Sequence, residues 1–191
     1  MLMKYNLYIV PVLGLISGLL AGMLSATVMK AHNGDEFLPG LLFGILIGLY
    51  YLLIKNRHSW LSLFGFMIAS TVAYFVAYAL AFFTYQSWNL FSFFLAGTMG
   101  AYLLALSFSL CIKKLRSSGM LLIALIGGAW AFVWIALALF FLPLDIGGAW
   151  SLGRMDDLQV FQANRGWVTL FASWQMLLGF SLAWFSRKTV S

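Results

Sequence analysis

Uncharged polar and aromatic side chains lie deep within the long apolar runs of this sequence, where they could bind a ligand. Tyr74 and Tyr78 are one helical turn apart in one run, and Trp130 and Trp134 are one turn apart in another. Gln175 lies at the centre of the last run. Together these five residues predict a pocket in which aromatic rings stack on a small uncharged or aromatic solute and Gln175 orients it.

The same side chains have a structural interpretation. A buried glutamine or tyrosine needs a hydrogen-bond partner inside the protein, because lipid supplies none. Gln175 would then tie neighbouring helices together, with a contribution of about 0.5–2 kcal/mol, and the aromatic rings would fill space between them. Residue types and spacing alone leave both interpretations open.

No Asp, Glu, Lys, Arg or His lies inside any of the apolar runs. A proton-driven pump and an intramembrane hydrolase with an activated nucleophile are therefore disfavoured, because both need such groups at membrane depth. The sequence also lacks a P-loop, an HExxH helix motif and a GxSxG turn. We expect no cofactor, no nucleic-acid partner and, on balance, no enzymatic activity.

Charged residues that could act on a ligand are confined to two connectors. Arg154, Asp156 and Asp157 lie in the polar segment 143–166, where they could form a lid or gate, carry out acid–base chemistry on lipid, or simply be solvated. Asp35 and Glu36 follow His32 in the first connector, in a pattern that a divalent cation could use. We favour a capping role for these two acids, since negative charge complements the start of the next helix, and we predict no metal site.

The composition identifies the solvent of most of the chain as lipid. Of its 191 residues, 63% are hydrophobic and 8% are charged, whereas soluble domains average about 45–50% and about 25%. A helix needs about 20 apolar residues to cross the hydrocarbon core. The sequence therefore predicts an all-α fold in one domain, residues 1–191, a bundle of six transmembrane helices at about 7–29, 37–54, 60–83, 90–112, 119–142 and 167–185.

The distribution of cations predicts the orientation of that bundle. With six spans, one side of the membrane holds most of the basic residues: Lys4, Lys55, Arg57, Lys113, Lys114, Arg116, Arg187 and Lys188. The other side holds three basic residues and all five acids. The positive-inside rule places both termini in the cytoplasm, and the short, compact chain favours a bacterial inner membrane.

Two glycine strips predict close helix packing. Gly14, Gly18 and Gly22 recur every fourth residue in the first run, and the second run repeats the pattern with Gly40, Gly44 and Gly48. Small residues let helix backbones approach closely in lipid. We expect the two runs to form a tight hairpin through these strips. Alternatively, the first strip is a docking face for another membrane protein.

In length and helix number the chain resembles the substrate-capture subunits of energy-coupling-factor vitamin transporters, which also carry a small-residue ladder on the first helix for docking. The resemblance implies a membrane subunit that captures a solute, and it assigns no individual residue. Three functions follow from the sequence. The first is a non-enzymatic subunit that binds or transports a small solute, the second is an accessory protein that packs against a partner, and the third is a lipid-modifying enzyme.

Overall fold

Six α-helices make up the described part of the chain. The computed structural model describes residues 2–28, 38–55, 60–88, 90–141 and 166–187. The helices are α1 (Leu2–Val28), α2 (Leu38–Lys55), α3 (Trp60–Trp88), α4 (Phe91–Cys111), α5 (Ser117–Phe141) and α7 (Gly166–Phe185). Each predicted run therefore corresponds to one helix, and the prediction of an all-helical fold is confirmed.

The helices have the length and composition of membrane-spanning segments. Four of them, α1, α3, α4 and α5, are long and apolar enough to cross a membrane, whereas α2 and α7 contribute shorter apolar stretches. Large apolar side chains also face outward, as at Tyr8, Leu61 and Leu110, which are 72%, 80% and 77% exposed. Water would not tolerate so many exposed apolar side chains, so these helices fit a membrane protein.

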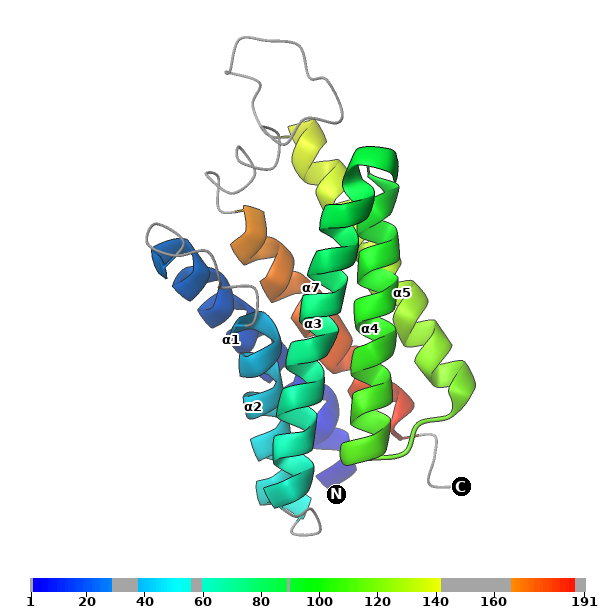
Figure 1. Cartoon of the computed structure of the whole chain (residues 1–191). Coiled ribbons are helices and arrows are strands. Elements are labelled where there is room, and N and C mark those ends of the chain that lie inside the picture. The colour runs from blue at the N-terminus through cyan, green and yellow to red at the C-terminus, as the bar shows by residue number, and fades with distance from the viewer. Residues whose placement is uncertain (1, 29–37, 56–59, 89, 142–165, 188–191) are drawn as a thin grey trace.

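The helices form a closed ring in chain order. Each helix packs beside the next one in the sequence, and α7 closes the ring between α5 and α1. Figure 1 shows α3 and α4 side by side, with α7 passing behind them, and it places the start of α1 and the end of α7 at the same end of the bundle. Lys113, which follows α4, donates a hydrogen bond to the Ser186 carbonyl after α7, so this end also carries basic residues.

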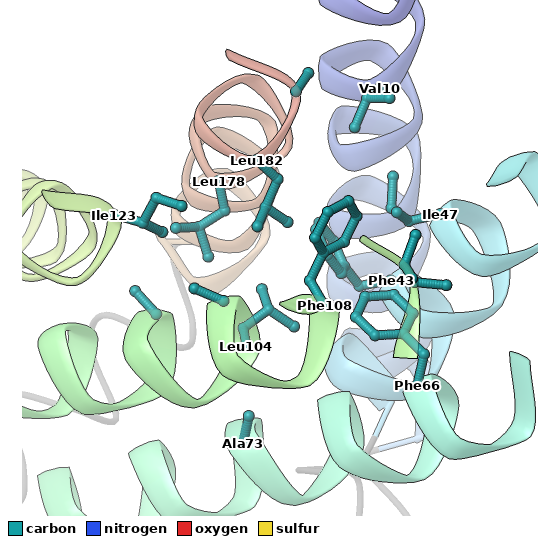
Figure 2. Packing of buried hydrophobic residues seen from close by; sticks show 14 of the residues in the cluster. Val10, Phe43, Ile47, Phe66, Ala73, Leu104, Phe108, Ile123, Leu178 and Leu182 are labelled. Atoms are coloured by element: carbon teal, nitrogen blue, oxygen red, sulfur yellow. The ribbon is translucent and has the colours of Figure 1, made fainter. Parts of the chain in front are cut away.

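All six helices contribute to an apolar core near that end of the bundle. Figure 2 shows Phe43 and Ile47 of α2 facing Phe66 of α3 and Phe108 of α4. The Phe66 and Phe108 rings meet edge to face, with centroids 6.0 Å apart, a geometry that aromatic quadrupoles favour. Leu178 of α7 is fully buried in the same core. Side chains of α2 therefore fill the interior on this side.

The helix α2 begins level with the middle of its neighbours. The Pro39 carbonyl, at its first turn, accepts a hydrogen bond from Gln175 near the middle of α7. A Cβ added at Gly40 would lie 2.6 Å from the Ser70 carbonyl oxygen, and residues 71–88 of α3 extend beyond that level, about 27 Å of helix at about 1.5 Å per residue. Figure 1 shows the same difference, with α2 starting well below the upper end of α3.

The helices α1 and α2 pack side by side, but Gly14 and Gly18 do not face the strip of α2, so the expected contact through the glycines is wrong at these residues. Added Cβ atoms at Gly14 and Gly18 would lie 2.3 Å from the Gln175 carbonyl oxygen and 2.5 Å from the Ala172 Cα, both on α7. The strip of α2 instead packs on α3, where Gly44 would place a Cβ 2.8 Å from the Met67 Cα.

The first strip is also covered by the chain itself. Gly14, Gly18 and Gly22 are all buried. Gly14 and Gly18 therefore lie in the α1–α7 interface, and docking of a partner protein on this strip stays a prediction. The sequence could not reveal this pairing, because α1 and α7 lie at opposite ends of the chain.

Candidate binding site at the start of α2

Gln175 joins three helices at the level where α2 begins. Its side chain is fully buried. The Nε2 group donates to the Pro39 carbonyl of α2 at 3.0 Å, and Oε1 accepts from the Ser17 hydroxyl of α1. The side chain therefore satisfies both ends of its amide inside the bundle, as the structural interpretation of this residue requires.

The proton of Ser17 can serve only one acceptor at a time. The Ser17 hydroxyl lies 2.9 Å from the Gly14 carbonyl as well as beside Gln175. The Gly14 carbonyl belongs to the helical ladder of α1 and has a backbone donor one turn later, whereas Oε1 has no other donor among the described residues. We therefore assign the Ser17 proton to Gln175, which fixes the orientation of the amide.

Tyr74 is the unsatisfied member of this cluster. Its side chain is 5% exposed, and its hydroxyl lies beside the Gln175 amide. No hydrogen bond of normal geometry reaches that hydroxyl from any described residue. A buried, unpaired hydroxyl costs about 1–3 kcal/mol, so its retention calls for a physical reason such as a ligand or an ordered water.

Trp174 forms the wall next to Tyr74, and we did not single it out from the sequence. Its indole Nε1 donates to the Gly127 carbonyl of α5 at 2.9 Å. Its ring meets the Tyr74 ring edge to face, with centroids 5.2 Å apart. A Cβ added at Gly100 of α4 would lie 3.5 Å from the same indole. One feature of the sequence could have identified Trp174. It lies beside Gln175 at the centre of an apolar run, away from the membrane–water interface that tryptophan prefers.

The other predicted aromatic residues lie apart from Tyr74. Tyr78 is 41% exposed and stacks on Phe82, with ring centroids 6.4 Å apart. Trp130 and Trp134 stack on each other along α5 at 6.2 Å, and the Trp130 indole donates to the Ser173 hydroxyl at 3.1 Å. The structure thus brings Tyr74 and Gln175 together and leaves the other three residues outside their cluster.

The packing of neighbouring helices on α3 changes at Tyr74. Before this residue, α2 packs on α3, and Ser70 donates from its hydroxyl to the Gly40 carbonyl at 2.8 Å. After it, residues 75–84 include no buried side chain. Tyr74 therefore marks the boundary between the packed part of the bundle and a part where α3 is less covered.

The cluster consists of groups that can bind a ligand. Its members are amide, hydroxyl, indole and backbone groups, and the described residues contain no Asp, Glu or His. The predicted lid or gate residues Arg154, Asp156 and Asp157 lie outside the described residues, as do His32, Asp35 and Glu36. Within the described residues the cluster can orient a ligand by hydrogen bonds and aromatic contact, and it offers no general acid or base of ordinary strength.

Comparisons with protein-family models, with curated proteins and with solved structures find no match to this chain.

Proposed function

We propose that this protein is a non-enzymatic integral membrane protein that binds a small solute within the bundle, at Tyr74, Trp174 and Gln175. The site combines a polar cluster with aromatic walls, which is the usual composition of a small-molecule site. Its position near the middle of the helices is the depth at which membrane transporters commonly bind their substrates. This depth supports the proposed role in solute capture or transport.

The unpaired Tyr74 hydroxyl is the observation that carries the proposal. The other polar side chains of the cluster have partners: Gln175 bonds to Ser17 and Pro39, and Trp174 bonds to Gly127. A side chain kept only for packing would be served equally well by phenylalanine, which lacks the desolvation cost of the hydroxyl. The hydroxyl is therefore explained by a partner that the chain itself does not supply.

Replacing Tyr74 by phenylalanine tests this explanation through stability. We expect the ligand-free Tyr74→Phe protein to be more stable than wild type by about 1 kcal/mol, because the change removes an unpaired buried hydroxyl and keeps the ring. The measurement is the free energy of unfolding in an SDS titration of protein washed free of small molecules. The stabilising effect of the protein's own membrane extract should be lost in the same variant.

Tyr78→Phe is the matched control, because it also removes a tyrosine hydroxyl. Tyr78 lies one helical turn after Tyr74, and its side chain is 41% exposed. The substitution should change neither the stability nor the response to the extract. If Tyr74→Phe destabilises the washed protein by 1 kcal/mol or more, the hydroxyl has a partner within the chain and the proposal loses its basis.

The proposed topology has six spans with both termini in the cytoplasm of a bacterial inner membrane. Its support is the group of basic residues at the end of the bundle where α4 and α7 finish: Lys113, Lys114, Arg116 and Arg187. Reporter fusions at either terminus should be active only with a cytoplasmic reporter. An active periplasmic reporter at the C-terminus would contradict this orientation.

A further inference from the structure

We infer that the solute presents a hydrogen-bond acceptor, a carbonyl or carboxylate oxygen on a flat apolar body, to Tyr74 and the first turn of α2. This inference rests on the proposed function and specifies the ligand of the same site. The Tyr74 hydroxyl has no partner of normal geometry among the described residues, and the start of α2 supplies a positive potential beside it.

The Gln175 and Pro39 carbonyl oxygens already accept hydrogen bonds from other residues of the chain. Gln175 Oε1 accepts from Ser17, and the Pro39 carbonyl accepts from Gln175 Nε2. The Tyr74 hydroxyl proton is left without an acceptor among the described residues. A ligand with an acceptor oxygen would pair with this proton, and the positive potential at the start of α2 favours an acceptor over a donor.

The start of α2 adds a second source of positive potential. The first N–H groups of a helix have no partner within the helix, and the helix dipole places a partial positive charge there. The Ser70 hydroxyl of α3 reaches the Gly40 carbonyl in this first turn, and Tyr74 lies one helical turn further along the same face of α3. The unpaired hydroxyl lies beside the Gln175 amide, which bonds to the Pro39 carbonyl in the first turn of α2.

The aromatic rings beside Tyr74 suit a flat apolar body. Phe171 and Trp174 of α7 flank the Tyr74 ring, with centroids 6.4 Å and 5.2 Å away. Aromatic side chains pack well against planar groups. The described residues at this site include no basic side chain that would select a charged ligand. A neutral carbonyl and a carboxylate both present the required acceptor oxygen, and the experiment below distinguishes them.

Three probes with one planar body test the inference: benzoate carries a carboxylate, benzamide a neutral carbonyl, and benzylamine a cation with no acceptor. The full-length protein in detergent is heated with each probe, and the remaining folded fraction is measured by size-exclusion chromatography. Benzoate, benzamide or both should raise the midpoint, and benzylamine should not. In Tyr74→Phe the apparent Kd of the active probe should rise about tenfold, and in Tyr78→Phe it should not change.

The outcomes separate the two proposals. Stabilisation by benzoate alone identifies a carboxylate ligand, and stabilisation by benzamide identifies a neutral carbonyl. If benzylamine stabilises the protein in a Tyr74-dependent way, the site is real and the inferred chemistry is wrong. If no probe stabilises it, or if Tyr74→Phe binds as well as wild type, the inference is overturned. The proposed function falls as well only if, in addition, the membrane extract fails to stabilise the wild-type protein.

Discussion

Gly18→Ala should weaken the whole bundle by about 3 kcal/mol, because it forces apart the two helices that close the ring. The added Cβ would lie 2.5 Å from both the Ala172 Cα and the Phe171 carbonyl oxygen. Both are backbone atoms, so no side-chain rotation relieves the overlap and α1 must move away from α7. The measurement is the free energy of unfolding of the purified protein in an SDS titration.

Gly65→Ala provides the matched control for this substitution. Its added Cβ would meet Cys111 Sγ at 3.4 Å, which is ordinary contact. Since alanine also favours the helix by up to about 1 kcal/mol, this variant should be as stable as wild type or slightly more stable. Equal stability of the two variants would show that α1 and α7 are not in backbone contact at Gly18.

Gln175→Leu should destabilise the protein by about 2 kcal/mol and loosen three helices together. The substitution introduces an apolar side chain of similar size and removes the bonds to Ser17 and Pro39. The buried Ser17 hydroxyl then loses the acceptor that we assign to it. Met176→Leu, at the next residue and 40% exposed, should leave the stability unchanged.

A double-mutant cycle shows whether the loss comes from the Ser17 bond. Ser17→Ala combined with Gln175→Leu should cost less than the sum of the single changes, with a coupling energy of about 1 kcal/mol. Strict additivity, within about 0.3–0.5 kcal/mol, would mean that the two side chains do not interact. The cycle would then contradict the assignment of the Ser17 proton to Gln175.

The sequence predicts the helices well because each depends on a local property. Apolar runs of sufficient length are visible directly, and Pro39 near the start of the second run is compatible with the first turn of a helix. The same reasoning identified Gln175 and Tyr74, because a polar group within an apolar run is conspicuous. The sequence grouped both residues in one pocket with three others, but it could not show that only these two would meet, because that depends on how side chains of α3 and α7 meet across the bundle.

The partners of the glycine strips show the limit of such reasoning. A strip such as Gly40, Gly44 and Gly48 indicates that something packs closely, and any neighbouring helix would satisfy it. We expected the two strips to face each other, and α1 instead uses Gly14 and Gly18 against α7, although α1 and α2 also pack side by side. The sequence also could not predict that α2 begins level with the middle of its neighbours, because the length of a helix does not reveal where it lies relative to the others.

Native mass spectrometry of the protein released gently from its own membrane tests most directly whether Tyr74 holds a small molecule. We predict a reproducible added mass of roughly a few hundred daltons, the range of small-molecule ligands, in wild type and in Tyr78→Phe. The added mass should be absent from Tyr74→Phe. A bare wild-type protein, or an added mass that persists in Tyr74→Phe, would contradict the account.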